Sequence, residues 1–129
     1  MAPLSVTLDR EARPVATVSL VGEHDAYSAG RIENELALLL EAAHAIVIDL
    51  QDATFVDSQT LSVLLSARHQ AEEGKLGFVL VLPPEPYTQV HRILEMTGLA
   101  TAFAIEPELE RGVASARAGR VTGDRVRAA

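Results

Sequence analysis

The stretch from His44 to Glu73 constrains the fold more than any other part of the chain. It begins with residues 45–50, AIVIDL, a β-branched and apolar run of the kind that forms a strand buried on both faces. After a short loop, apolar residues recur at helical spacing, at Leu61, Leu64, Leu65 and Ala71. A buried strand that leads into an amphipathic helix is the repeating unit of an α/β fold.

Asp57 and Ser58 lie where this predicted helix begins. Asp57 is expected to be the N-cap residue, because its carboxylate can accept hydrogen bonds from the unpaired amides of the first turn. Ser58 then falls in the first turn, with its hydroxyl directed to solvent. An exposed serine at a helix N-terminus is a place where a protein can present chemistry. The alternative is structural, since serine is common at helix starts and Asp57 caps the helix in either case.

The same two patterns recur along the rest of the chain. Further strands are predicted at residues 4–8, 15–21, 76–82 and 101–105, and further helices between Asp25 and Ala43, around 90–97 and from Glu106 to Ala118. The order β-β-α-β-α-β-α-β-α predicts an α/β fold, a mixed and mostly parallel sheet with right-handed crossover helices. The first two strands are expected to form a hairpin.

The chain length predicts a single domain over residues 1–118. Residues 119–129 lack apolar periodicity and are expected to form a flexible C-terminal tail. Within the domain, Gly74 is expected to be the C′ residue of the helix that begins after Asp57. Arg68 and His69 of that helix are expected to face solvent or the edge of the sheet.

Composition excludes several classes of function. The net charge of −7 argues against a nucleic-acid partner, and the absence of cysteine excludes disulfides and thiolate metal sites. The four histidines lack the spacing of metal ligands, so no metal site is expected. No signal peptide and no apolar run of about 20 residues is recognised, so the sequence predicts a cytoplasmic protein that does not span a membrane.

Residues 46–61, IVIDLQDATFVDSQTL, resemble the signature of STAS domains, in particular the anti-sigma-factor antagonists. That signature is an apolar strand, Asp-Leu, a short loop, and an aromatic-apolar-Asp-Ser-Ser/Thr-Gly-Leu segment. Residues 22–25 (GEHD) and 94–99 (LEMTGL) resemble two further landmarks of the family, so the resemblance covers about residues 15–115. It implies the STAS fold and makes Ser58 the residue that a partner kinase phosphorylates.

The expected partner-binding surface combines two strand ends. His24 and Asp25 follow a strand that should run parallel to the one before Ser58, so both should reach the same edge of the sheet. Asp25 is also a candidate helix cap. Gln59 and Thr60 stand where the family has Ser or Thr and then Gly, and Thr60 is expected to add a side chain to the docking surface. The residues expected to bind a partner are Asp25, His24, Asp57, Ser58, Gln59 and Thr60.

The resemblance implies a binding protein, not an enzyme, with no cofactor of its own. Its partner would be an anti-sigma factor with serine kinase activity, whose binding ends when Ser58 is phosphorylated; a PP2C-type phosphatase would restore it. The alternative is a STAS scaffold subunit of a signalling assembly or transporter complex that does not cycle through phosphorylation. A hydrolase triad of Ser58, His24 and Asp25 is disfavoured, because adjacent residues rarely orient one another and no G-x-S-x-G elbow is present.

Overall fold

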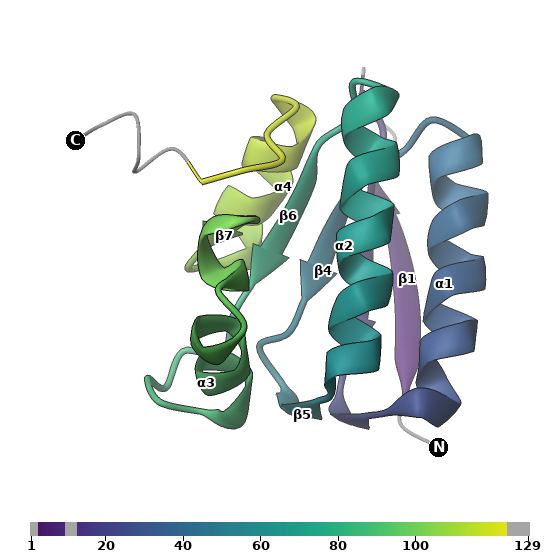
Figure 1. Cartoon of the computed structure of the whole chain (residues 1–129). Helices are drawn as coiled ribbons and strands as arrows, with labels where there is room; N and C mark the ends of the chain where they lie inside the picture. Colours follow the sequence, from purple (N-terminus) through teal and green to yellow (C-terminus); the bar gives the residue numbers. More distant parts are fainter. Residues whose placement is uncertain (1–2, 10–12, 124–129) are drawn as a thin grey trace.

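A central β-sheet with helices on both faces organises the chain. In this computed structural model, which describes residues 3–9 and 13–123, the sheet order is β1-β2-β4-β6-β7 (Figure 1). Its strands are β1 (Leu4–Asp9), β2 (Val15–Leu20), β4 (Ala45–Asp49), β6 (Phe78–Val81) and β7 (Ala104–Glu106). β1 is antiparallel to β2, and every other neighbouring pair is parallel. The predicted fold class and the N-terminal hairpin are therefore confirmed.

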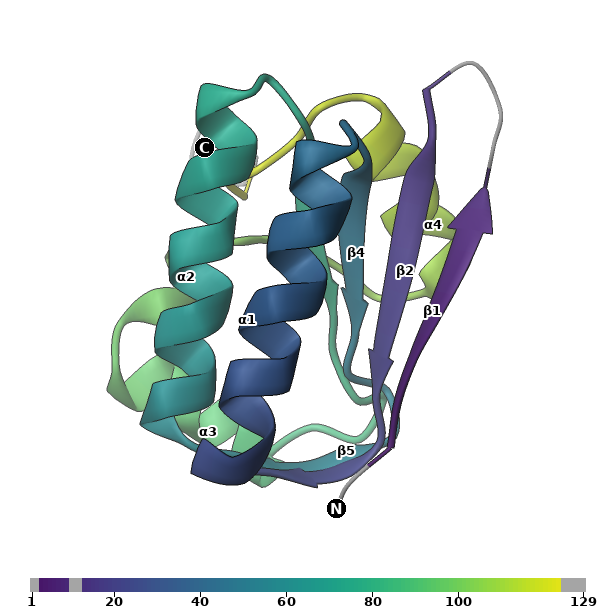
Figure 2. The same cartoon turned by 90° about the vertical axis from the view of Figure 1, so that its right-hand side faces the viewer.

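The helices enclose two hydrophobic cores, one on each face of the sheet. Figure 2 shows α1 (Ala26–Glu41) and α2 (Ser58–Glu73) side by side on one face and α4 (Leu109–Arg117) on the other. Because side chains alternate along a strand, Ile46 and Ile48 of β4 enter the larger core, whereas Val47 packs beneath α4. Helix α4 approaches the sheet closely at Gly112, where an added Cβ would lie 2.7 Å from Val81 Cγ2.

Two short strands were absent from the prediction. β3 (Gly22–His24) and β5 (Ala53–Val56) form a separate parallel ribbon at the carboxyl ends of β2 and β4. The first was expected only as the end of a longer strand, and the second was seen only as an apolar pair before the helix. Three- and four-residue strands are too short to show a period of two, so the sequence pattern could not reveal them.

The last third of the chain differs from the prediction in its boundaries. Helix α3 spans Gln89–Met96, as expected, but a 3₁₀ turn at Leu99–Thr101 replaces the start of the predicted strand. The strand itself is β7, shifted to 104–106, and α4 begins at Leu109 instead of Glu106. Phe103 lies before the strand, in a bend, but its side chain is wholly buried. The apolar run 101–105 therefore continues from the turn into the strand, and the sequence pattern does not show where the strand begins.

The C-terminal end of α2 also differs from the expectation. Gly74 occupies the C-cap with φ of −85°, and the left-handed conformation expected of a C′ glycine falls instead on Lys75, with φ of +59°. Leu76 N then donates to Ala71 O, which closes the helix. The residue in the left-handed conformation, which glycine adopts most easily, is thus Lys75, one position after the glycine.

The predicted tail begins too early. Arg120 O accepts a hydrogen bond from Phe78 N, and Val121 O accepts one from Ala104 N, so this segment lies across the starts of β6 and β7. Val121 is half-buried against the larger core. We call Arg120 and Val121 the C-terminal strap. Two residues are too few to show an apolar period, so composition alone could not distinguish the strap from a tail. Residues 124–129 of the predicted tail lie outside the described residues.

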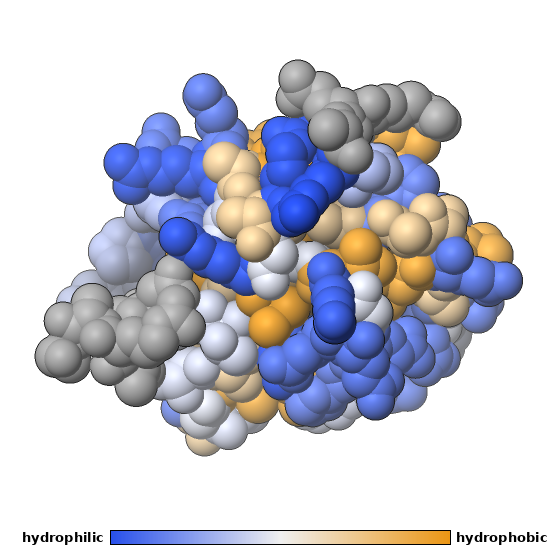
Figure 3. Space-filling model, turned by 90° about the horizontal axis from the view of Figure 1, so that it is seen from above, coloured by the Kyte–Doolittle hydropathy of each residue, from blue (hydrophilic) through white to orange (hydrophobic). Residues whose placement is uncertain are grey.

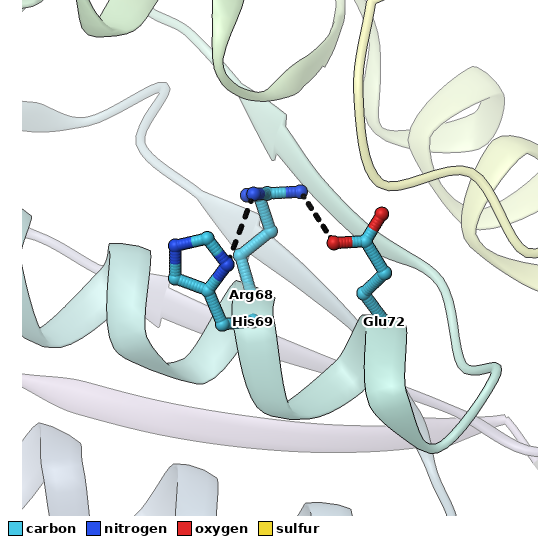
Figure 4. A network of polar contacts seen from close by, with 3 residues as sticks. All are labelled: Arg68, His69 and Glu72. Carbon is cyan, nitrogen blue, oxygen red and sulfur yellow. Dashed lines mark hydrogen bonds and ion pairs between the residues drawn. The ribbon is translucent and has the colours of Figure 1, made fainter.

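The expectation that Arg68 faces solvent is wrong, whereas His69 is exposed as expected. Arg68 lies four residues after Leu64 and three before Ala71, so helical geometry places it on the buried side of α2, and it is only 7% exposed. Figure 4 shows its guanidinium between two neighbours: Nη1 lies 3.6 Å from Glu72 Oε1, and Nη2 lies 3.2 Å from His69 Nδ1. Within the described residues, its Nε and Nη1 are buried without a hydrogen bond, so the ion pair with Glu72 and the contact of Nη2 with His69 are what offset the burial of its charge.

Candidate docking site

The ends of β3 and β5 bring the two predicted halves of the site together. The strands pair in parallel with His24 opposite Val56, and Asp57 N donates to His24 O over 3.2 Å. Helices α1 and α2 both begin at this end of the molecule, which is the lower end in Figure 1. The expected convergence of the 22–25 and 56–58 segments at one edge is confirmed.

Asp57 and Ser58 have the local geometry that the sequence predicts. Asp57 is the N-cap of α2, and its Oδ1 accepts a hydrogen bond of 2.8 Å from Thr60 N. Ser58 is the first residue of the helix and is exposed, as is Gln59. The hydroxyl of Ser58 therefore lies at the positive end of the helix dipole, next to a half-buried carboxylate.

Asp25 begins the neighbouring helix in the same way. Its Oδ1 accepts from Tyr27 N over 3.0 Å, and Ser28 Oγ accepts from Asp25 N, so Asp25 and Ser28 form a capping box. The expectation that Asp25 caps this helix is therefore confirmed. Asp25 remains exposed, and its carboxylate lies beside the paired ends of β3 and β5.

His24 lies beneath the surface. Its ring is wholly buried, with Nδ1 3.2 Å from Ser28 Oγ and Nε2 3.1 Å from Val21 O. Burial lowers the pKa of His24 below its usual 6.5, because the charged ring would lose its hydration. The resemblance placed His24 among the partner-binding residues, but its side chain is a support under the site and not part of its surface.

Thr60 is also buried, so the expectation that its side chain extends over the docking surface is wrong. The side chain is wholly enclosed, and its Oγ1 donates to His24 O over 3.2 Å. His24 O therefore accepts from both Asp57 N and Thr60 Oγ1. A threonine at this position adds a hydrogen bond between the two segments, which the glycine of the family pattern cannot make.

Gln89 is a residue of the site that sequence reasoning missed. Its Oε1 accepts from Val56 N over 2.9 Å, and its Nε2 donates to Val56 O over 2.8 Å. The side-chain amide thus pairs with β5 as a neighbouring strand would, on the residue just before Asp57. No local signal marks Gln89, because the contact joins residues 33 positions apart.

Exposed aromatic side chains lie on the elements that meet at this end of the molecule. Tyr27 is 89% exposed in the first turn of α1, Phe55 is 38% exposed on β5, and Tyr87 is 81% exposed just before α3. We call the exposed residues Asp25, Tyr27, Phe55, Ser58 and Gln59, together with the half-buried Asp57, the Ser58 surface. Aromatic residues without internal partners are typical of protein interfaces.

The opposite end of the molecule has a different character. In Figure 3, which views that end, hydrophilic side chains surround smaller apolar patches. Its exposed residues include Glu41, Glu72, Glu73 and Lys75, at the ends of α1 and α2. Exposed aromatics and an exposed serine therefore distinguish the Ser58 end as the more suitable surface for a protein partner.

The described part of the chain contains neither a metal-binding cluster nor a helix suited to span a membrane. Among residues 3–9 and 13–123, no three His, Asp or Glu side chains come close enough together to hold a metal ion. None of the helices within these ranges is long and apolar enough to cross a membrane.

The chain belongs to the STAS domain family, since the family described as "Mlab, STAS domain" matches residues 7–109. Its fold is similar to that of an anti-sigma factor antagonist from Mycobacterium paratuberculosis, with 27% sequence identity, a TM-score of 0.67, and coverage of 89% of this chain and 95% of that one. The resemblance to STAS domains of the anti-sigma-factor antagonist type is confirmed.

Two structures of SpoIIAA show the same fold at lower identity. The unphosphorylated form of this anti-sigma factor antagonist is 20% identical, with a TM-score of 0.67 and coverage of 97% of this chain and 98% of that one. The phosphorylated form of the Bacillus protein is also 20% identical, with a TM-score of 0.58 and coverage of 83% and 96%.

Proposed function

We propose that this protein is an anti-sigma factor antagonist whose Ser58 surface binds an anti-sigma factor with serine kinase activity. The observation that carries the proposal is the position of Ser58: it is exposed and is the first residue of α2, at the end of the molecule where α1 also begins with the exposed Tyr27. The similarity to antagonists of known structure supports it. In this proposal the protein acts in the cytoplasm by binding and uses no cofactor.

Phosphorylation of Ser58 ends binding by adding charge to the Ser58 surface. A phosphoserine carries about −1.5 to −2 charges at neutral pH. The fold tolerates that charge, because the amides and dipole of the α2 N-terminus stabilise anions, although the neighbouring Asp57 partly offsets the gain. At a packed interface, an unpaired charge costs several kcal/mol, or more than about a hundredfold in affinity. A PP2C-type phosphatase would reverse the change.

The proposal gives the six predicted partner-binding residues two different roles, according to their burial. Asp25, Asp57, Ser58 and Gln59 reach the surface to different extents and are the proposed contacts. His24 and Thr60 are wholly buried, and they act by fixing the backbone that carries the four surface residues. The threonine at position 60 therefore adds no side chain to the Ser58 surface. Of the two departures from the family pattern, only Gln59 changes the chemistry of that surface.

The test measures binding to a candidate anti-sigma kinase by calorimetry, with phosphorylation followed by intact mass. Ser58→Ala should bind as the wild type does and resist ATP, whereas Ser58→Asp should bind weakly and retain the circular dichroism of the fold. Ser62, exposed one turn further along α2, is the matched control, and Ser62→Ala and Ser62→Asp should change little. Equal affinities for wild type, Ser58→Ala and phosphorylated protein would contradict the proposal and favour the scaffold subunit that does not cycle.

A further inference from the structure

Among the described residues, no strand pairs with the outer edge of β1 in the main sheet. Figure 2 shows β1 as the outermost strand, beside β2 and away from β4. Its residues 4–8, LSVTL, include β-branched and apolar side chains and no charge. Natural edge strands are usually protected by charges, prolines, bulges or covering segments, because unpaired N–H and C=O groups pair readily with another strand. Pro3 precedes this run and does not interrupt it.

The opposite edge of the same sheet has this protection. Strand β7 is only three residues long, Ala104–Glu106, and Pro107 follows it directly. Glu106 carries a charge at this edge and forms an ion pair of 3.6 Å with Arg120. Val121 O accepts from Ala104 N, so the C-terminal strap covers the start of β7. β1 is also bordered by a proline and a charge, Pro3 and Asp9, but five uncharged residues lie between them, so β1 offers a longer edge for pairing than the three residues of β7.

The register with β2 identifies which backbone groups of β1 are open. Val21 N donates to Pro3 O, so Pro3–Val21 is a hydrogen-bonded pair of the antiparallel ladder. Such pairs alternate with pairs that are not hydrogen-bonded. Ser5, opposite Ser19, and Thr7, opposite Thr17, therefore direct their backbone groups towards β2. The N–H and C=O groups of Leu4, Val6 and Leu8 point outward, away from the sheet.

These outward groups are complementary to a second copy of themselves. We propose that β1 pairs with β1 of another copy of this chain, antiparallel and with a twofold axis at Val6. In this register Val6 lies opposite the Val6 of the second copy, and Leu4 lies opposite Leu8, all in hydrogen-bonded pairs. The centre of symmetry of the sequence LSVTL thus coincides with a residue whose backbone groups are open.

The side chains support the same register. Leu4, Val6 and Leu8 lie opposite Leu20, Val18 and Ala16 of the larger core, so they share its face of the sheet. Leu8 is 38% exposed at present and would be covered by the Leu4 of the second copy. On the other face, exposed Ser5 and Thr7 would lie opposite one another, where hydroxyl pairs are favourable. No like charges lie opposite one another within residues 4–8.

This interface is independent of the Ser58 surface and needs no partner protein for its test. Sedimentation velocity of the purified chain over a concentration series should show a monomer–dimer equilibrium. Val6→Pro removes the outward N–H and should weaken dimerisation about thirtyfold, from the loss of two central hydrogen bonds. Val6→Ala is the matched control: it loses the same side-chain packing but keeps the N–H, and should dimerise far better than Val6→Pro.

A cross-linking pair decides the register even if Val6→Pro fails to fold. The natural chain has no cysteine, so a single introduced thiol reports one position. Opposite Cα atoms in a hydrogen-bonded pair are about 5.5 Å apart, within disulfide range, so Val6→Cys should oxidise readily to a dimer. Two copies of Thr7→Cys would be two residues out of register, about 7–8 Å apart, and should cross-link poorly.

Three results would overturn self-pairing. One is a wild-type chain that stays monomeric at millimolar concentration, which would leave an extended segment of a different protein as the occupant of the edge. The second is equal dimerisation of folded Val6→Pro and Val6→Ala. The third is cross-linking of Val6→Cys no faster than that of Thr7→Cys. None of these results bears on Ser58, so the two proposals fail separately.

Discussion

Replacing Gln89 with alanine should destabilise the protein by about 2–4 kcal/mol. The substitution removes both hydrogen bonds of the side-chain amide, 2.9 Å from Val56 N and 2.8 Å to Val56 O. Val56 is wholly buried, so its N–H and C=O would be left without partners unless water enters. Each unsatisfied buried group costs about 1–3 kcal/mol, and entry of water brings the total towards the lower end of the range.

Gln89→Glu allows the contributions of the two hydrogen bonds to be measured separately, because the second one forms only when the introduced carboxyl is protonated. An ionised carboxylate still accepts from Val56 N, but its second oxygen faces Val56 O and cannot donate. Protonation restores the donor, so folding raises the pKa of the introduced carboxyl above its unfolded value of about 4.3. The stabilising proton is fully bound below that value and is lost as pH rises through the higher folded pKa. The deficit of Gln89→Glu relative to wild type should therefore be small near pH 4 and large at pH 7.

The assay is urea denaturation of wild type and variants between pH 4 and pH 8, followed by circular dichroism. Gln70→Ala is the matched control, because Gln70 is an exposed glutamine within α2, and it should change the free energy of unfolding by less than about 0.5 kcal/mol. If Gln89→Ala matches this control, or if the deficit of Gln89→Glu is independent of pH, Gln89 does not support β5.

Three shorter predictions follow from caps, burial and the C-terminal strap. Asp57→Ala should lower the free energy of unfolding by about 1 kcal/mol in urea titrations, because Thr60 N loses its acceptor. Burial lowers the pKa of His24, so the unfolded chain binds more protons; wild-type stability should fall as pH drops below about 6.5, and His24→Gln should reduce that slope. Truncation after Ala118 should lower the melting temperature by about 5 °C more than truncation after Gly123, because it removes Val121, the two backbone hydrogen bonds of the strap to Phe78 and Ala104, and two more that Gly119 and Arg120 donate to the end of α4; equal melting temperatures would contradict the role of the strap.

Local chemistry made much of this architecture predictable from the sequence. The run 45–50 and the helical spacing after it could be assigned because strands and helices sort apolar residues with periods of two and 3.6. Asp25 and Asp57 could be identified as caps because the hydrogen bonds of a cap join residues two or three positions apart. The exposed position of Ser58 followed from the same argument.

Contacts between distant segments could not be predicted in this way. Thr60 is buried because His24, 36 positions earlier, offers a carbonyl oxygen to its hydroxyl. Gln89 pairs with Val56 only because the chain returns to β5 after crossing the sheet. Arg68 was predicted wrongly for a different reason. Its helical position lies on the apolar side of α2, but its charge favoured the prediction that it faces solvent.

These distant contacts fix the backbone beneath the serine. His24 O accepts from Asp57 N and Thr60 Oγ1, on either side of Ser58, while Gln89 holds Val56 just before it. The backbone around Ser58 is therefore bonded to neighbouring elements, and the serine itself remains exposed. A surface ordered in advance loses little conformational entropy when a partner docks. Hence a phosphate on Ser58 would act on the partner mainly through charge, because the start of α2 that carries it is already fixed by hydrogen bonds from the buried Thr60 and from Gln89.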